Sequence, residues 1–474
     1  MLISTIVQVH RSAVTVTALR EFNFIGCDLV TFHSEALKPG IEDSPVVQLA
    51  LKDIERAVVH GRAFASLKSF TATNIARLKL EQHAFKLKVS TDLPTIKIKL
   101  LNVSLSSLLS SAFPSSFKSI SFENGRIENI ATNAFSGQQI NLISFNGTTI
   151  QRIEKGAFSN NAAIELLHFD NCNISSLSRK SVEAGMTKFH LTNSEIQSIT
   201  KRGAIAATVA SVRIEHNRFK TLSTEAFQFK FWDNVIIHNN TFDFVEEGAI
   251  NGIKAPSEDL PTSFTFTDNR IIDPNMRSLV TQIPHSVNIT VQGNSFGKKC
   301  DCQMHLYIKS VCGSTELSNP FVDLSVALNE TSSCRVESRA RPCFEQASIF
   351  NGHASTSLSS YNQKFCQSKP LPSCFLQSKG EEEDEVVRME DRDMATFYDE
   401  FVLLFQVKTT KGILLFLLFC VLSSVATVTI CVAAIWVQRY SSRFLFGFFV
   451  ILDLDFVRLG KVKSCFFNAE SLVY

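Results

Sequence analysis

Several histidine, carboxylate and arginine side chains in the middle of the chain recur at intervals that could bring them together. Each follows a short run of alternating apolar residues, and they are His168, Asp170, His190, Thr192, Arg213, Glu215 and His238. If these runs are neighbouring β-strands, which lie about 4.8 Å apart, the side chains form one continuous polar strip. Imidazoles that titrate near about pH 6 to 7 would make binding there sensitive to pH. The strip is a candidate surface for a protein partner, although a solvated sheet face also has to be polar.

The same residues offer little for catalysis. Asp170 and Glu215 could form a carboxylate pair of the kind that hydrolyses glycosides. The chain contains no Gly-rich phosphate loop, no His-Glu-x-x-His and no Gly-x-Ser-x-Gly. His168 and His190 have no third metal ligand at a regular spacing, and in an exported chain Cys300 and Cys302 favour disulfides over zinc. We therefore predict no catalytic residues, no cofactor and no metal site.

The elements that must position the strip are sequence repeats. One pattern recurs, with apolar-x-apolar first, two further apolar residues, and then Ala-Phe or a relative of it. Its first apolar residues are Phe22, Leu49, Phe70, Ile98, Ile120, Ile143, Leu167, Phe189, Val212, Val235, Phe264 and Ile289. Their mean spacing is about 24 residues, which is typical of solenoids built from stacked repeats. The 40 Phe of the chain, beside 2 Trp and 5 Tyr, predict one long repetitive core.

A polar residue three places after each apolar-x-apolar pair is expected to serve the backbone. Asn217, Asn240, Asn269 and Asn294 occupy this place, and Cys27, Thr148, Cys172 and Ser194 occupy it in other repeats. A buried turn leaves backbone groups without ladder partners, and such side chains can bond them. Two repeats depart from the pattern at the first of the two further apolar positions. They have Arg56 and Arg77 where the others have Ile or Phe.

With these repeats the chain resembles the leucine-rich repeat family, with Phe and Ile replacing much of the Leu. The resemblance covers Phe22 to about Cys374, and its most specific part is the exit VQGNSFGKKCDC, Val291 to Cys302. It implies an α/β solenoid, a horseshoe of about 12 repeats with short parallel strands, followed by a disulfide cap. The region holds seven cysteines, Cys300, Cys302, Cys312, Cys334, Cys343, Cys366 and Cys374. The resemblance implies that Cys300, Cys302 and two later cysteines form the two disulfides of the family's cap, which leaves an odd thiol. A right-handed β-helix, whose coils have a similar length, is the competing fold.

A membrane anchor is expected near the C-terminus. Gly412 to Val437 is 26 residues long and carries no charge, which is enough helix to cross a bilayer. Arg439 and Arg443 follow it, so its C-terminal side is expected to be cytoplasmic. The predicted organisation is an N-terminal remnant without a clear signal peptide (1–21), the solenoid (22–299), the cysteine-rich cap (300–375), an acidic stalk (376–411), the transmembrane helix (412–437) and a short cytoplasmic tail (438–474).

The six candidate N-glycosylation sites fit an extracellular solenoid. They are Asn102, Asn146, Asn173, Asn239, Asn288 and Asn329. Glycans at Asn146 and Asn288, and beside the strand at Asn102 and Asn239, would leave the strip from His168 to Glu215 as the clearest window.

The predicted function is that of a single-pass protein of the plasma membrane, with its N-terminus outside and no enzyme activity. It is expected to recognise a protein ligand or a partner on a neighbouring cell, as an adhesion molecule or receptor. A net charge of +2 argues against nucleic acid as a partner. An extracellular β-helix enzyme acting on glycans and a structural matrix tether are the alternatives, and both monomer and homo-oligomer fit the sequence.

Overall fold

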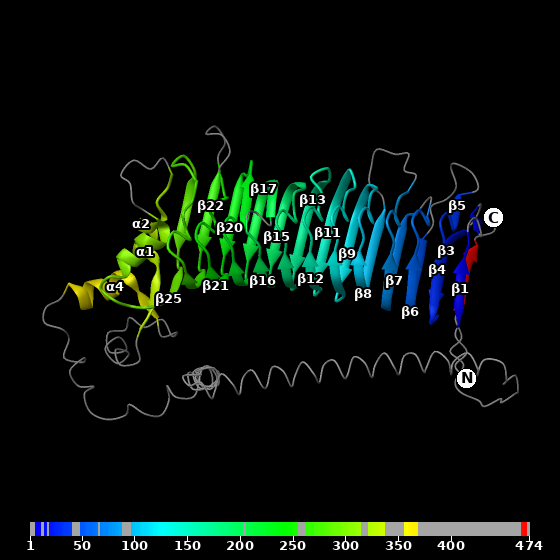
Figure 1. Ribbon diagram of the computed structural model, residues 1–474, viewed down its shortest axis with the longest axis horizontal. Helices are drawn as coiled ribbons and strands as arrows, with labels where there is room; N and C mark the ends of the chain where they lie inside the picture. The colour runs from blue at the N-terminus through cyan, green and yellow to red at the C-terminus, as the bar shows by residue number, and fades with distance from the viewer. Residues whose placement is uncertain are drawn as a thin grey trace, which may run out of the picture. The chain divides into compact units, whose positions relative to one another are not determined.

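The chain forms a parallel β-solenoid. The computed structural model describes residues 5–10, 14–16, 19–39, 48–64, 67–87, 96–201, 205–254, 262–313, 321–336, 355–367 and 466–471. Successive turns of the solenoid lie side by side, from β1 and β4 to β25 (Figure 1). All twelve marker residues pair in one register, from Phe22 with Leu49 to Phe264 with Ile289. The predicted repeats and their phase are therefore confirmed.

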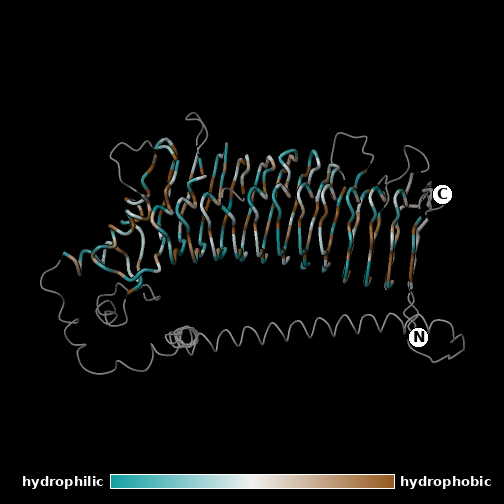
Figure 2. Tube along the Cα trace, viewed as in Figure 1, coloured by the Kyte–Doolittle hydropathy of each residue, from teal (hydrophilic) through white to brown (hydrophobic). Residues whose placement is uncertain are grey.

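The first face of the solenoid is a parallel sheet that carries the apolar-x-apolar pairs. Three of its strands run on into the second face, β6 (Gln48–Val59), β7 (Ser69–Leu80) and β8 (Lys97–Leu108). The others are β3 (Leu19–Ile25), β9 (Phe117–Glu123), β11 (Gln139–Asn146), β13 (Ala163–Asp170), β15 (Gly185–Thr192), β17 (Ile205–Glu215), β20 (Asn234–His238), β22 (Ser263–Thr267) and β24 (Asn288–Gln292). Hydrophobic and hydrophilic residues follow one another along the turns (Figure 2). Because successive side chains of a strand point to opposite faces, one set lies inward and the other outward.

The two later apolar residues of each repeat also lie on strands, which form a second parallel face. They are β1 (Ile6–Val9), β4 (Leu29–Phe32), β10 (Arg126–Ile130), β12 (Thr149–Ile153), β14 (Asn173–Leu177), β16 (Glu195–Ile199), β18 (Arg218–Leu222), β21 (Thr241–Val245), β23 (Arg270–Pro274) and β25 (Ser295–Lys299). β1 pairs with β4 in register, so residues before Phe22 already take part in the solenoid. The sequence pattern placed strands only on the first face, because apolar residues three apart do not show the alternation typical of a strand.

A third face carries the Ala-Phe positions. Single parallel bridges join Phe113, Phe135, Phe158, Val182 and Ile205 in turn. β2 (Val14–Val16), β5 (Leu37–Pro39) and β19 (Phe227–Lys230) are the strands of this face. In the repeat that starts at Phe189, Ile205 therefore takes the place that Phe occupies in most other repeats. Hydrogen-bonded pairing on all three faces makes the solenoid parallel throughout.

Stacked phenylalanines fill the interior. Phe113, Phe135 and Phe158 form one column, in which neighbouring ring centroids are 5.2 and 4.8 Å apart and nearly parallel. Phe122, Phe145 and Phe169 form a second column with spacings of 4.7 and 4.9 Å. The columns meet edge to face, as between Phe145 and Phe158 at 87°. These geometries are the ones that aromatic quadrupoles favour, so the predicted Phe core is confirmed.

Left-handed backbone makes the corner after every first-face strand. The residue four places after each marker has a positive φ, and these residues are Gly26, Asp53, Asn74, Asn102, Asn124, Gly147, Asn171, Asn193, His216, Asn239, Asp268 and Gly293. Gly, Asn, Asp and His are the residues that tolerate this conformation best. This regularity is visible in the sequence and is a further signature of the repeat.

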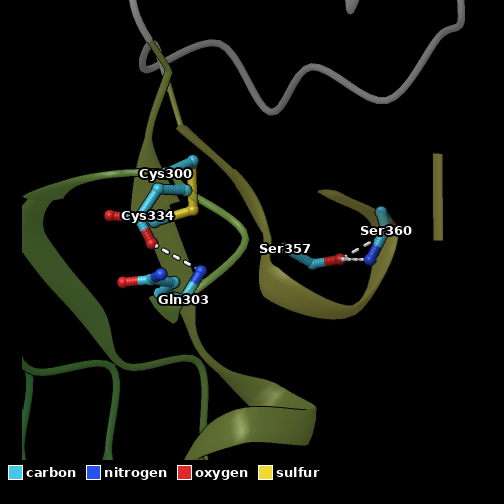
Figure 3. Close-up of a disulfide and its surroundings, with 6 residues drawn as sticks. Cys300, Gln303, Cys334, Ser357 and Ser360 are labelled. Carbon is cyan, nitrogen blue, oxygen red and sulfur yellow. Dashed lines mark hydrogen bonds between the residues drawn. A yellow bond between two sulfur atoms is a disulfide. The ribbon is translucent and has the colours of Figure 1, made fainter. Parts of the chain in front are cut away.

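The cap closes the C-terminal end with helices and disulfides. Its elements are α1 (Met304–Cys312), α2 (Leu324–Thr331), β26 (Ser333–Arg335), β27 (Ser355–Ser357), α4 (Leu358–Tyr361) and η2 (Asn362–Cys366). Cys300 bonds to Cys334 (Figure 3), and their Cα atoms are 5.2 Å apart. Cys302 bonds to Cys366, with Cα atoms 5.5 Å apart. The expectation that Cys300 and Cys302 pair with two later cysteines is confirmed. Cys343 and Cys374 lie outside the described residues.

The part of the chain after the cap is described only at residues 466–471. This segment forms β28 (Phe466–Ser471), which pairs antiparallel with β3. The predicted stalk and the predicted anchor, Gly412 to Val437, lie outside the described residues. Within the described ranges, no helix combines the length and the apolar character that a bilayer span requires.

Candidate functional site: a polar strip on the first face

The seven predicted strip residues lie in two adjoining rows on neighbouring first-face strands. His168 of β13, His190 of β15 and Arg213 of β17 are register partners in one row. Asp170, Thr192, Glu215 and His238 are register partners in the other, which continues onto β20. The rows exist because positions one and three after each marker both point outward. The structure therefore brings the predicted residues together on one surface.

Thr192 links the first part of the strip into a hydrogen-bonded group. Its hydroxyl donates to Asp170 Oδ1 at 2.7 Å and lies 3.2 Å from His168 Nε2. Asn193 Nδ2 also donates to Asp170 Oδ1, at 2.8 Å. The His168 and His190 rings meet edge to face, with centroids 5.7 Å apart. These contacts hold the His168 and Asp170 side chains in defined positions on the sheet.

The second part of the strip is more open. Arg213 is exposed, and its Nε lies 3.4 Å from Glu215 Oε1. His238 Nδ1 is 2.9 Å from Thr267 Oγ1 and 3.4 Å from Asp268 Oδ2, so its partners extend the polar surface to β22. Arg213 therefore offers a charge to a ligand, whereas His238 is oriented by its neighbours.

The pKa values of three strip residues, His168, Asp170 and His190, are shifted by their surroundings. Burial lowers the pKa of His168, and this effect exceeds the opposite effect of the Asp170 carboxylate. Burial also lowers the pKa of His190, together with repulsion from His168, Arg213 and Lys188. Burial raises the pKa of Asp170, but hydrogen bonds from Asn193 and Thr192 and the charge of His168 lower it by more. His168 and His190 therefore titrate below the ordinary histidine range, and at neutral pH they act as hydrogen-bonding groups.

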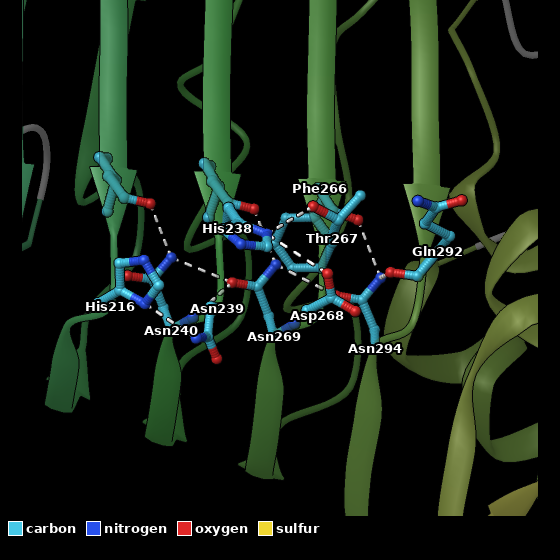
Figure 4. A network of polar contacts seen from close by, with 12 residues as sticks. His216, His238, Asn239, Asn240, Phe266, Thr267, Asp268, Asn269, Gln292 and Asn294 are labelled. Carbon is cyan, nitrogen blue, oxygen red and sulfur yellow. Dashed lines mark hydrogen bonds and ion pairs between the residues drawn. The ribbon is translucent and has the colours of Figure 1, made fainter.

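A ladder of buried polar side chains runs beside the strip and supports the corner of each turn. The Nδ2 groups of Asn217, Asn240 and Asn269 donate to Leu191 O, Ile214 O and Ile237 O at 2.7, 2.8 and 2.9 Å. The Oδ1 atoms of Asn240, Asn269 and Asn294 accept the backbone N–H groups of Asn217, Asn240 and Asn269, each at 3.0 Å. Figure 4 shows Asn240, Asn269 and Asn294 in line on successive turns. Asn294 donates to Phe266 O at 2.9 Å. The predicted role of these asparagines is confirmed.

Smaller groups continue the ladder toward the N-terminus. Ser194 N–H donates to Asn217 Oδ1, and the Ser194 hydroxyl accepts from Cys172 N–H. The Cys172 thiol donates to Phe145 O, and the Thr148 hydroxyl donates to Phe122 O. Cys27 is buried at the corresponding place and is disulfide-bonded. Bonds between neighbouring members therefore link the ladder from Cys172 to Asn294, and Thr148 occupies the same place one turn earlier.

The candidate glycosylation sites lie at the surface. Asn102, Asn146, Asn173, Asn239 and Asn288 are exposed, and Asn329 is half-buried in α2. Asn102 and Asn239 donate from Nδ2 to Asn74 Oδ1 and His216 Nδ1. Asn146 pairs in register with Asp170 and Asn288 with Ser263, which places both at the first face as predicted.

Two cysteines are free thiols deep in the protein. Burial raises the pKa of Cys172 to about 11 and raises the pKa of Cys312 still further. Thiols with such pKa values stay protonated near neutral pH and are poor nucleophiles. Among the described residues, no group of three or more His, Cys, Asp or Glu side chains is arranged to hold a metal ion.

A histidine column on the second face was not anticipated. The rings of His10 and His33 stack with centroids 4.6 Å apart, and those of His33 and His60 with centroids 5.0 Å apart. The column ends where His60 Nδ1 lies 2.9 Å from Glu81 Oε2. The sequence does contain a pattern that predicts this column. A His directly follows Val9, Phe32 and Val59, which are the last inward residues of three successive second-face strands.

Comparison with known proteins adds no family assignment, because the chain matches neither a protein-family model nor a curated protein.

Proposed function

We propose that this protein is a cell-surface protein of the leucine-rich-repeat type that recognises a protein ligand through the polar strip. One observation carries the proposal, namely that β13, β15, β17 and β20 present seven polar side chains in two aligned rows. The hydrogen-bond donors and acceptors of the strip, and its exposed cation Arg213, point away from the core, so each can be substituted without disturbing core packing. Solenoids use such extended faces for binding.

The cap supports a location outside the cytosol. Two disulfides, Cys300–Cys334 and Cys302–Cys366, secure the end of the solenoid. Such bonds persist in oxidising compartments and are rare in the cytosol. We propose that Gly412 to Val437 anchors the protein in the plasma membrane with the solenoid outside.

Membrane topology can be tested directly, because a single span and the pairing of β28 place residues 466–471 on opposite sides of the membrane. A single span puts residues 466–471 in the cytoplasm, whereas their pairing with β3 puts them beside the solenoid. The two arrangements exclude each other in one molecule. We would express the full chain behind a supplied signal peptide, with one tag before Met1 and another after Tyr474. The proposal expects the first tag to be labelled on intact cells and the second only after permeabilisation. Labelling of both tags on intact cells would overturn the single span.

Ligand recognition is tested with variants of the displayed full chain. A screen against secreted and cell-surface proteins provides a ligand, and Arg213→Ala and Glu215→Gln then report on the strip. Each substitution is expected to weaken binding by about tenfold or more, as truncation at a binding centre does. Arg152→Ala is the matched control, because Arg152 is equally exposed but lies on the second face. Equal loss in the control and in the strip variants would show that the strip is not the site. A matrix tether would tolerate all three substitutions.

A glycan-acting enzyme is the second candidate, and one observation favours it. Asp170, Thr192 and Glu215 are register partners, so the two carboxylates lie two strand spacings, or about 9.6 Å, apart. This is close to the separation of about 6.5–9.5 Å in inverting glycosidases. The lowered pKa of Asp170 suits a base and not an acid. Hydrolysis of a glycan by the native chain, lost in both Asp170→Asn and Glu215→Gln, would favour this candidate over the receptor.

A further inference from the structure

A basic groove lies on the second face near the N-terminal end of the solenoid, away from the strip. Its volume is about 390 Å³, and it crosses β6, β7, β8 and β10. The side chains that give it its character are Arg56, Arg77, Lys79, Ser104, Ser106 and Arg126. Ala57, Leu78 and Leu105, all buried, form its base.

The groove arises because two neighbouring strands are out of phase. In β7 two residues separate the inward Ile75 and Leu78, whereas in β8 one residue separates their partners Val103 and Leu105. The extra residue in β7 is compensated after Leu78, where one residue separates it from Leu80 and two separate Leu105 from Leu108. The pleats of the two strands therefore do not coincide, and a hollow opens between them.

The same extra residue explains the arginines that interrupt the repeat pattern. Arg56 and Arg77 pair in register and are both exposed, because Ala57 and Leu78 take the inward places. Arg77 Nη2 lies 2.9 Å from Glu55 Oε1, and Lys79 Nζ lies 3.0 Å from Glu81 Oε1. Arg56 and Arg126 form no ion pair within the described part of the chain. Glu128 is the acidic residue that lines the groove. The lining therefore carries more positive than negative charge, and the two guanidinium groups without a described ion pair, Arg56 and Arg126, lie at its ends.

The distance between those ends restricts the ligand. Arg56 and Arg126 are on β6 and β10, which are three strand spacings, or about 14 Å, apart. An extended chain with at least two anionic groups spans the groove from Arg56 to Arg126 more fully than one sulfate or phosphate ion does. Guanidinium groups bind sulfate and carboxylate through paired hydrogen bonds. The hydroxyls of Ser104 and Ser106 between the arginines match the hydroxyls of a sugar.

We propose that this groove binds a sulfated polysaccharide. The two cap disulfides indicate an oxidising compartment, where sulfated polysaccharides and not nucleic acids are the abundant polyanions. Arg77 and Lys79 already contact protein carboxylates, so a ligand gains binding free energy there only if its charge density exceeds that of an acidic side chain. This site is separate from the polar strip, and neither depends on the other.

The test uses the purified full chain and an immobilised heparin hexasaccharide at about 0.15 M NaCl. Arg56→Gln combined with Arg126→Gln is expected to weaken binding at least tenfold. The slope of log affinity against log salt should fall by about 1 to 2, because two cation–anion contacts are lost. Arg152→Gln combined with Arg179→Gln is the matched control, since it removes two exposed arginines outside the groove. Circular dichroism and thermal unfolding check that both double variants remain folded.

The outcomes distinguish binding at the groove from non-specific electrostatic attraction to the whole protein. Retention of tight binding by the control and its loss in the groove variant support the proposal. Equal weakening in both variants would show that net charge, and not the groove, is responsible. Equal competition by heparin and by polyglutamate of the same charge would overturn the assignment to a sulfated ligand, and so would undiminished binding to desulfated heparin.

Discussion

The corner after the first face is built in two ways, one in the N-terminal turns and one in the C-terminal turns. In β6, β7 and β8 this corner holds a buried apolar residue, Ile54, Ile75 or Val103. Each of these strands continues without a break from the first face to the second. Asn240 and Asn269 occupy it farther along, where separate strands such as β20 and β21 meet at the corner. The repeat thus keeps its period while the chemistry of its corner changes.

The difference shows how pairing of the backbone selects the side chain. Where strand pairing continues through the corner, as between Ile54 and Ile75, an apolar residue leaves no carbonyl without a partner. Where pairing stops, a side chain with both a donor and an acceptor must replace it, and asparagine has both. Gly125 lies between the two kinds of corner, and a Cβ there would come within 2.7 Å of Val103 O. The close approach of two turns requires glycine at this position.

The largest expected effect comes from removing one asparagine of the ladder. Asn240→Leu keeps the number and branching of side-chain heavy atoms but leaves Ile214 O and the Asn217 N–H without partners. The free energy of unfolding should fall by about 3–5 kcal/mol, because each buried unpaired group costs about 1–3 kcal/mol. Urea unfolding measures the change, and hydrogen exchange at Asn217 should show local opening. Asn161→Leu, at an exposed asparagine, should change stability little. A stable Asn240→Leu protein would mean that the ladder does not hold the corner.

The reverse exchange tests the N-terminal kind of corner. Ile75→Asn is expected to lower the free energy of unfolding by about 2–4 kcal/mol, because it buries an amide where neighbouring strands already pair. Urea unfolding again measures the effect, with Ile75→Val as the control that keeps the site apolar. If Ile75→Asn were as stable as the native chain, the two corners would be interchangeable, and the comparison would fail.

The histidine column predicts a pH dependence confined to the N-terminal turns. Burial lowers the pKa of His33, and the neighbouring His10 and His60 lower it further. The unfolded chain therefore binds a proton more readily than the folded chain. The contribution of His33 to stability is full above about pH 6.5, the unfolded pKa, and is lost as the pH falls toward the folded pKa. Hydrogen-exchange protection near β4, corrected for the intrinsic pH dependence of amide exchange, should be lower at pH 5.5 than at pH 7.5, and His33→Gln should reduce the difference. Replacing the exposed His285 should not.

The smallest expected effect is at a thiol in the middle of the ladder. Cys172→Ser keeps a donor to Phe145 O, so the free energy of unfolding should change by less than about 1 kcal/mol. Cys172→Ala, which removes the donor, should be the less stable of the two. Urea unfolding of the pair compares them directly. A large loss in Cys172→Ser, equal to that in Cys172→Ala, would show that packing of the sulfur and not hydrogen bonding matters there.

Much of the fold could be predicted because it is set by local patterns. The marker phase, the Phe core, the polar ladder and the entry into the cap all depend on which residues in one repeat point inward. The candidate strip was predictable for the same reason, since residues beside an inward pair must point outward. The second and third faces were not, because their pairing partners lie in other repeats. On the second face the apolar residues are also three apart, which does not show the alternation typical of a strand.

The sequence by itself determined the repeat, its register and its burial pattern, since alternation of side chains fixes which face of a strand is buried. Only the tertiary structure decided what lies side by side across turns. Thr192 bridges His168 and Asp170, three imidazoles stack in a column, and Cys334 and Cys366 are the partners of Cys300 and Cys302. Arg56 and Arg77 point outward because Ala57 and Leu78 take the inward places, one residue out of phase with β8. Lateral contacts depend on the side-chain phase of both neighbouring turns, and no single repeat contains that information.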